Sequence, residues 1–234
     1  VQDDQEGIYY DLMLPSQKTI IQIEMTGMPL DIVKVRNVRN KLERITRDNY
    51  QIIAGSPTVQ KAQTEIRIEA RDKANAKLKT KQHPLSKFED PDDPSYVEFN
   101  PGSGDQLRNL LYDLMDLPKL DFTKTKLAST GTKTLKKLRN HTKSKEYVAV
   151  INAIIDHQTA EKILNTFIPA FERAIDKGDG VVWLHGSFNL GGTVSGRLSS
   201  SNPNLQNIPA GSVYGKLIKE FPSTRHMQTC NRRR

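Results

Sequence analysis

The sequence predicts an α+β fold in which a mainly helical region precedes the first antiparallel strands of a sheet. Apolar residues recur at steps of three and four through much of the chain up to about residue 171, as on the buried face of a helix. Past Gly178, β-branched and aromatic residues stand between glycines, which is typical of short strands. A chain of 234 residues is long enough for one large or two small domains.

The N-terminal part predicts two helices in succession. The first lies within residues 16–25, where Gly27 closes it in the left-handed conformation and Pro29 stops the chain from continuing it. Asp31 is placed to cap the second. Its charged residues lie on one face, and its apolar residues form a stripe that is expected to be buried. The apolar stripe consists of Val35, Val38, Leu42 and Ile45.

Residues 58–80 and 83–96 predict surface structure. The first segment is rich in Lys, Arg, Glu and Ala, and indicates an exposed helix with little to bury. The second, HPLSKFEDPDDPSY, has three prolines and clustered acids, and predicts a loop. Its carboxylates could hold a cation, but they lack ligand spacing, so a solvated loop is the favoured interpretation.

The second half predicts further helices and then strands. Ser103 and Gln106 match a capping box ahead of a helix with Leu107, Leu110, Leu111 and Leu114 on one face. Another helix has Tyr147, Val150, Ile151 and Ile154 in the same pattern, continued by Ile163, Phe167 and Phe171 with a break at Pro169. Residues 181–184 and 187–194 predict two strands, interpreted as a hairpin.

The net charge of the chain is concentrated in one window. The whole chain has 35 Lys+Arg against 27 Asp+Glu, a formal charge of +8 that suits a polyanion such as nucleic acid. Residues 119–145 contain one acid, Asp121, and nine bases: Lys119, Lys124, Lys126, Lys133, Lys136, Lys137, Arg139, Lys143 and Lys145. Interleaved hydroxyls and a helix capped near Ser129 or Thr130 would add phosphate-binding donors. A solvated charged face is an equal alternative.

Cysteine content and hydropathy exclude several classes of protein. The single Cys230 excludes an internal disulfide and a zinc cluster of cysteines, and indicates a reducing compartment, hence a cytoplasmic location. His226, four residues before it, would make a two-ligand metal site at best, so the pair is taken as incidental. No apolar run is long enough for a membrane span, and the N-terminal residues do not form a signal peptide. Val1 in place of Met suggests a fragment.

Residues 191–209, GGTVSGRLSSSNPNLQNIP, predict a polar loop at the edge of a sheet. Gly196 would allow close backbone approach, and Pro203 and Pro209 would define turns. Every base pair presents hydrogen-bond acceptors in the minor groove, and several side chains of this loop could donate to them. These side chains are Arg197, Asn204, Gln206 and Asn207. The alternative is a loop whose amides cap its own turns.

Four segments resemble DNA polymerase family A. TVSGRLSSSNPNLQNIP, residues 193–209, resembles the TxTGRLSSxxPNLQNIP signature upstream of that family's motif A. Residues 99–118 resemble FNxxSxxQLxxxLFxxLxLP, and residues 123–138 resemble the lysine-bearing TKTGxxSTxxxxLxxL. Residues 23–31, IEMTGMPLD, are similar to MExxGxxxD. The resemblance covers the chain apart from the first few residues, residues 55–97 and the last fourteen.

The resemblance implies a helical thumb that grips primer-template DNA, followed by the first antiparallel strands of a palm. Residues 1–30 would lead into the thumb, and residues 31–157 would form it, with an insertion at about 56–97. Residues 158–221 would begin the palm, with the primer-template-binding segment at 193–209. Residues 222–234 are expected to form a divergent basic tail. The inserted region resembles the enlarged thumbs of some phage members, so a phage-encoded protein in a bacterial cell is hypothesised.

The same resemblance implies a set of DNA-binding residues. Lys124, Lys126 and Lys133 would lie near phosphates, and Arg197 would lie against the primer-terminal base pair. Lys162 and Thr166 match the family's RxxxKxxST segment, although Gln158 stands where arginine is usual. The remaining contacts to primer-template would come from Thr193, Asn204, Gln206 and Asn207.

The implied activity is DNA-directed DNA polymerisation for DNA replication, with two Mg²⁺ ions held by palm aspartates. The first of these is expected soon after residues 215–221, yet no Asp or Glu follows Glu220. No catalytic or metal-binding residue is therefore expected here, and the chain alone is expected to be inactive. Its expected partners are primer-template DNA and a second polypeptide with the remaining palm and fingers. The alternative is a non-catalytic DNA-binding module or a truncated remnant.

Overall fold

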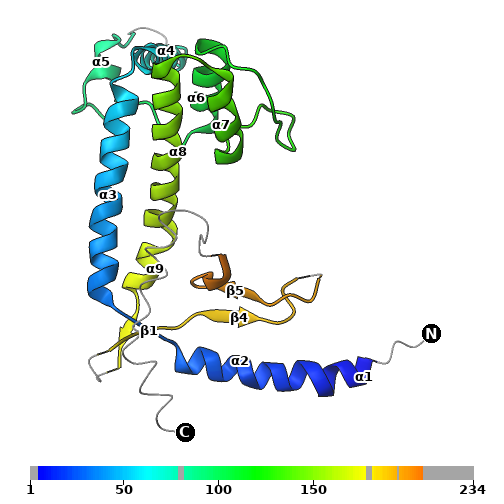
Figure 1. Ribbon diagram of the computed structural model, residues 1–234. Helices are drawn as coiled ribbons and strands as arrows, with labels where there is room; N and C mark the ends of the chain where they lie inside the picture. The colour runs from blue at the N-terminus through cyan, green and yellow to red at the C-terminus, as the bar shows by residue number, and fades with distance from the viewer. Residues whose placement is uncertain (1–4, 79–81, 178–180, 194, 208–234) are drawn as a thin grey trace. The chain divides into compact units, whose positions relative to one another are not determined.

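The computed structural model describes residues 5–78, 82–177, 181–193 and 195–207 (Figure 1). The chain forms two compact units: residues 1–43 with 162–234, and residues 44–161. Helices make up most of the described residues, and their strands are short and pair antiparallel, which confirms the predicted α+β class. No helix in these described ranges is long and apolar enough to cross a membrane.

The unit of residues 44–161 is helical around one apolar core. Its elements are the C-terminal part of α3 (Ile32–Ala54), α4 (Pro57–Asn75), α5 (Ser86–Glu89), α6 (Gly104–Arg108) with the π-helix η2 (Asn109–Leu114), α7 (Thr132–Leu138) with the 3-10 turn η3 (Arg139–His141), and most of α8 (Lys145–Thr166). The predicted apolar faces meet in the core, where Leu110, Leu111, Leu135, Leu138, Ile151 and Ile154 are fully buried. Burying each such side chain contributes about 1.5–3 kcal/mol.

Helix α4 differs from its prediction in its C-terminal end and in two buried residues. It ends at Asn75, whose side chain donates to the His83 carbonyl at 3.1 Å and accepts from the His83 N–H at 2.7 Å. Val59 and Ala62 lie in the core, whereas the rest of α4 is exposed or half-buried, so the helix buries a narrow face near its N-terminal end and is otherwise as predicted. The next segment, predicted as a loop, contains the short helix α5 between its prolines. Phe88 of α5 is buried.

The hydrogen bonds at two helix starts agree only in part with the predicted caps. Ser103 caps α6 by accepting from the Gln106 N–H at 3.5 Å, but the Gln106 carboxamide accepts from the Asn100 N–H at 2.6 Å. The capping box is therefore not reciprocal. The N-cap of helix α7 is Gly131, one residue after Thr130, and the Ser129 hydroxyl does not cap the helix but accepts from the Gly131 N–H in the preceding turn.

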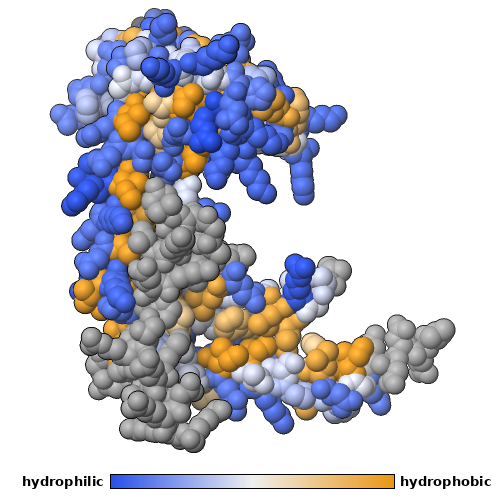
Figure 2. Space-filling view, viewed as in Figure 1, coloured by the Kyte–Doolittle hydropathy of each residue, from blue (hydrophilic) through white to orange (hydrophobic). Residues whose placement is uncertain are grey.

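The other unit opens with one continuous helix built from α1 (Gln5–Gly7), the π-helix η1 (Ile8–Met13) and α2 (Leu14–Thr26). It ends as predicted at Gly27, but it begins well before residue 16. Of its last apolar residues only Ile20 is buried, whereas Ile21, Ile23 and Met25 are exposed. Figure 2 shows hydrophobic residues gathered over this helix and the neighbouring strand β4.

The IEMTGMPLD segment has a structural role at three positions. Glu24 accepts from the Phe188 N–H at 2.6 Å, which ties α2 to β4. Gly27 has φ 74°, and a Cβ there would lie 2.7 Å from His185 Cε1, so only glycine fits. Asp31 accepts from the Lys34 N–H at 3.1 Å and caps α3, as predicted.

Short strands form two small antiparallel sheets in this unit. β1 (Met28–Leu30) and β2 (Ile175–Asp176) both pair with β3 (Val182–Leu184), in the order β1-β3-β2. β4 (Ser187–Asn189) pairs with β5 (Ser199–Ser201). The predicted hairpin between residues 181–184 and 187–194 is therefore wrong, because β3 and β4 belong to different sheets. The break at Pro169 is confirmed, since it lies in the first turn of α9 (Ile168–Glu172), after α8 ends.

Candidate nucleic-acid interface

The first group of candidate residues lies on a small hairpin in the unit of residues 44–161. Phe122 and Ala128 form an antiparallel bridge. The Thr123 N–H donates to the Leu127 carbonyl at 2.8 Å, and the Lys126 N–H donates to the Thr123 carbonyl at 2.9 Å. Lys124 and Lys126 therefore stand on the closing turn, where both are exposed. We refer to residues 122–128 as the basic hairpin; in Figure 1 it lies in the green loop that projects from beside α7.

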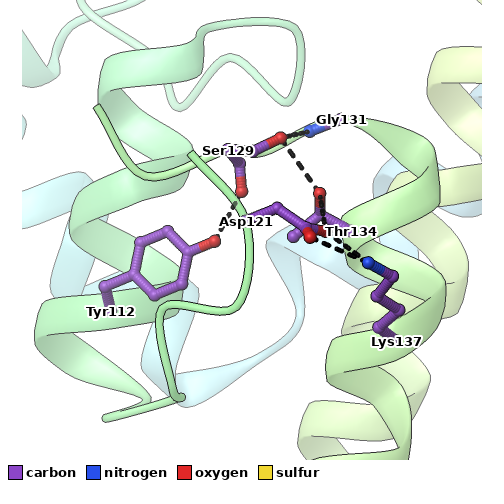
Figure 3. Close-up of polar contacts among 6 residues, drawn as sticks. All are labelled: Tyr112, Asp121, Ser129, Gly131, Thr134 and Lys137. Carbon is purple, nitrogen blue, oxygen red and sulfur yellow. Dashed lines mark hydrogen bonds and ion pairs between the residues drawn. The ribbon is translucent and has the colours of Figure 1, made fainter. Parts of the chain in front are cut away.

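Polar contacts hold the base of the basic hairpin (Figure 3). The Asp121 carboxylate accepts from Lys137 Nζ at 2.8 Å and from the Thr134 hydroxyl at 2.9 Å. The Ser129 N–H donates to the Asp121 carbonyl at 2.8 Å, and the Tyr112 hydroxyl donates to the Ser129 carbonyl. The hydrogen bond from Lys137, followed by that from Thr134, lowers the pKa of Asp121. The carboxylate is thus ionised at neutral pH and anchors the hairpin to α7.

The turn of the basic hairpin places Lys126 in an uncommon backbone conformation. Its φ is 61°, in the left-handed region. Hairpins with three-residue loops place one residue in this region, and glycine is preferred there. The TKTGxxST pattern of the family has its glycine at this position. That glycine indicates a residue in the left-handed region, and the turn could therefore have been predicted from the pattern.

The cations around the hairpin are largely uncompensated. Lys133 and Lys136 are exposed on α7. Of the predicted phosphate-binding lysines, none pairs with an acid among the residues that the structure describes. The one acid of the window is already engaged by Lys137. In the sequence Asp121 is distinguished only as the one acid of the window, and its role as an anchor depends on the contacts with Lys137 and Thr134.

Further candidates lie on α8. Lys162 is exposed, and belongs to the unit of residues 1–43 and 162–234. Thr166 is the last residue of α8. In the unit of residues 44–161, the Gln158 carboxamide donates to the Pro101 carbonyl at 2.9 Å. The residue that replaces the family's arginine therefore has a structural contact that joins α8 to the loop before α6.

The loop between β4 and β5 contains Thr193 and Arg197. The Thr193 hydroxyl donates to the Arg197 carbonyl at 2.7 Å, and the Gly196 N–H donates to the Thr193 carbonyl at 3.2 Å. Gly196 has φ 69°, which accounts for the glycine, and no described atom lies within 4 Å of an added Cβ, so the space beside its backbone is open. Arg197 and Thr193 are both exposed at this turn.

The turn after β5 is organised by a buried hydroxyl. Ser200 donates to the Pro203 carbonyl at 3.2 Å and accepts from the Leu205 N–H at 3.2 Å. This holds the 3-10 turn η4 (Leu205–Asn207), which includes Gln206 and Asn207. Gln206 is exposed. Pro209 lies outside the described residues.

A cavity of about 390 Å³ brings two of the implied positions together. Thr166 at the end of α8 and Asn204 after β5 both line it. Trp183, His185 and Arg173 complete its polar and aromatic wall. The surface near Asn204 is therefore hollowed, with the side chains of α8, α9 and β3 behind it.

Among the described residues, no group of three or more His, Cys, Asp and Glu lies together in a way that could hold a metal ion. These residues therefore do not fit the two-metal site that the resemblance implies, and we assign none of them to Mg²⁺. His226 and Cys230 fall outside the described residues.

The family model for DNA polymerase family A matches residues 65–230. The chain is 28% identical over 216 residues to the thermostable DNA polymerase I of Thermus caldophilus, covering 91% of this chain and 20% of that protein. It is 39% identical over 124 residues to DNA polymerase I of Helicobacter pylori, covering 53% of this chain and 12% of that protein.

A solved structure shares the fold. It is described as the POL domain of Pol1 from M. smegmatis in complex with DNA primer-template and dNTP, with a TM-score of 0.64 and 22% identity, covering 94% of this chain and 30% of that one. The chain spans about a fifth of the length of its thermostable relative. The family match covers well over half of the chain, and this chain therefore belongs to DNA polymerase family A.

Proposed function

We propose that this chain is the thumb and the start of the palm of a DNA-directed DNA polymerase, and that it binds primer-template DNA. The observation that carries the proposal is the basic hairpin, where Lys124 and Lys126 are exposed, unpaired with described acids, and held on an anchored turn. Ammonium groups presented in this way bind phosphates without reading the base sequence. The structure that shares this fold contains primer-template and dNTP, which is consistent with this role.

The polar loop of the other unit supplies the second part of the proposed DNA surface. Arg197 would lie against the primer-terminal base pair, supported by its exposed position on the Thr193–Arg197 turn. The remaining residues of this part are Lys162, Thr193, Asn204, Gln206 and Asn207. Their donors would meet minor-groove acceptors that are shared by all correct pairs, so they would sense pair geometry. A lost bond to a charged donor would cost about 1.5–3 kcal/mol.

Template-directed nucleotidyl transfer is proposed for the complete polymerase. Two Mg²⁺ ions would supply the chemistry there, activating the primer hydroxyl and neutralising phosphate charge. The described residues would contribute binding and alignment of the primer-template. This proposal includes the division into thumb and palm and the insertion at about 56–97. It also includes a second polypeptide that carries the remaining palm and fingers.

The salt dependence of DNA binding tests the phosphate-binding role. Binding of a fluorescent primer-template duplex is measured from 50 to 300 mM KCl for the wild type and for Lys124→Ala/Lys126→Ala/Lys133→Ala. Each lost phosphate contact removes counterion release, so the slope of log affinity against log salt should fall by up to about 0.9 per contact. A triple variant with the wild-type slope would refute the role.

The control removes the same charge elsewhere on the same unit. Lys61, Lys73 and Lys77 are exposed and lie outside the basic hairpin and α7. Their combined replacement by alanine should leave the slope near that of the wild type. An equal loss in both variants would mean that the binding reflects overall charge and not the hairpin.

A further inference from the structure

The basic hairpin also exposes two large apolar side chains. Phe122 is 62% exposed and Leu127 is 48% exposed. They stand directly before and after the turn that carries Lys124 and Lys126. Burial of such side chains in the core would stabilise the fold, but here most of their apolar surface stays in water. Exposed apolar side chains that lie next to unpaired charges on an ordered turn are typical of a surface that contacts another molecule.

We propose that Phe122 and Leu127 pack on the deoxyribose edge of duplex DNA while Lys124 and Lys126 bind the phosphates on either side. This inference rests on the proposed binding of primer-template by the basic hairpin. The backbone of a DNA strand alternates anionic phosphates with largely apolar sugars. The hairpin presents both kinds of complementary side chain together, with apolar residues at 122 and 127 and basic residues at 124 and 126.

Geometry supports a preformed surface. The bridge between Phe122 and Ala128 and the bond from the Thr123 N–H to the Leu127 carbonyl join the two strands. The Leu127 N–H donates to the Thr123 hydroxyl at 3.2 Å, which closes the turn further. Since the backbone is already ordered, contact with DNA would immobilise only side chains, which limits the entropic cost of binding.

Charge favours DNA over a protein as the occupant. Asp121 is the sole acid between residues 119 and 145, and it is held by Lys137 at the base of the hairpin. The tip therefore presents positive charge with no acidic counterpart among the described residues. A protein partner would need an acidic surface with an apolar centre, whereas any DNA strand has both features along its whole length.

The test separates apolar from ionic contacts by their salt dependence. Phe122→Thr/Leu127→Thr removes the apolar area and keeps residues suited to strands. Duplex affinity should fall about tenfold at every salt concentration, with the slope unchanged, because lost apolar contacts release no counterions. Lys124→Ala/Lys126→Ala should instead lower the slope.

Two further variants serve as controls. Ile52→Thr/Leu78→Thr removes exposed apolar side chains elsewhere on the same unit and should bind like the wild type. Phe122→Tyr/Leu127→Met keeps most of the apolar area and should recover most of the affinity that the threonine variant loses. Urea unfolding of each variant checks that the fold is intact. If the double threonine variant does not fold, the single variants Phe122→Ser and Leu127→Thr replace it. Each single variant is expected to lose about threefold in affinity for the duplex.

The outcomes distinguish this inference from the proposed function. Wild-type affinity in Phe122→Thr/Leu127→Thr, with a reduced slope in the lysine variant, overturns the sugar contact but leaves phosphate binding intact. An unchanged slope in the lysine variant overturns phosphate binding itself. Loss of affinity in both, with the two different salt signatures, supports the combined surface.

Discussion

Lys126 combines charge with a backbone conformation that residues with a side chain avoid. Its φ of 61° lies in the left-handed region, which costs such a residue about 1–2 kcal/mol. Glycine would adopt the same turn without this cost, and the family pattern has glycine there. The lysine adds a second cation to the turn that already carries Lys124.

Substitutions at Lys126 separate these two effects. Lys126→Gly and Lys126→Ala both remove the charge, but only glycine relieves the left-handed strain. In urea unfolding, Lys126→Gly should be about 1 kcal/mol more stable than Lys126→Ala. Both should weaken DNA binding equally and lower its salt slope. Equal stability of the two variants would contradict the strained turn.

At the scale of elements, α4 is joined to α8 through one carboxylate. Glu146, in the first turn of α8, accepts from the Ser56 hydroxyl at 2.6 Å and from the Thr58 hydroxyl at 3.1 Å. Ser56 is the N-cap of α4, so Glu146 adds negative charge at the N-terminus of that helix. The bond from Ser56, followed by those from Thr58, lowers the pKa of Glu146 despite its partial desolvation.

This lowered pKa predicts acid sensitivity. A carboxylate with a lower pKa in the folded state stabilises the fold above its unfolded pKa of about 4.3, and that stabilisation is lost as pH falls through the folded value. Glu146→Gln should lower the free energy of unfolding at pH 7, and the difference from the wild type should shrink towards pH 3. Chemical denaturation at several pH values measures this.

Glu89→Gln is the matched control for charge. Glu89 is exposed on α5, and its side chain forms no hydrogen bond or ion pair with a described residue. Its substitution should leave stability nearly unchanged at both pH values. A difference for Glu146→Gln that stays constant from pH 7 to pH 3 would show that the carboxylate contributes through packing and not through its ionised hydrogen bonds.

On the scale of the whole molecule, the proposed DNA surface is divided between two compact units. The basic hairpin belongs to residues 44–161, whereas Lys162 and the loop with Arg197 belong to the other unit. Each part has its own local supports: Asp121 and Lys137 in one, and Ser200 with the Thr193–Arg197 turn in the other. Each part can therefore be altered by surface substitution without disturbing the supports of the other.

Primer extension tests the activity proposed for the complete polymerase. Phosphoryl transfer by two metal ions needs carboxylate ligands, and in the part of the chain that the structure describes no group of three or more His, Cys, Asp and Glu could hold a metal ion. With Mg²⁺ and all four nucleotides, this chain alone should not extend a primer, and addition of a polypeptide with the remaining palm and fingers should restore extension. Extension by the chain alone would contradict the proposal, and inactivity in both would favour a non-catalytic DNA-binding module.

Local patterns in the sequence predicted most helices and the polar loop. Asp31 and Ser103 cap helices as expected, and Leu110, Leu111, Ile151 and Ile154 are buried as their spacing required. Predictions failed where a partner distant in sequence decides the structure. β3 pairs with β1, more than 150 residues earlier in the chain, so the adjacent strand β4 was the wrong partner to expect.

By itself the sequence determined the fold class, the family and the position of the charged window, because periodicity, motif and composition are local properties of the chain. Only the tertiary structure decided that Asp121 anchors the basic hairpin, that Lys126 adopts a left-handed conformation, and that Val59 and Ala62 make α4 part of the core. These depend on which side chains meet across loops and between helices. Such contacts are selected by packing and hydrogen-bond geometry in three dimensions, which spacing along the chain does not specify.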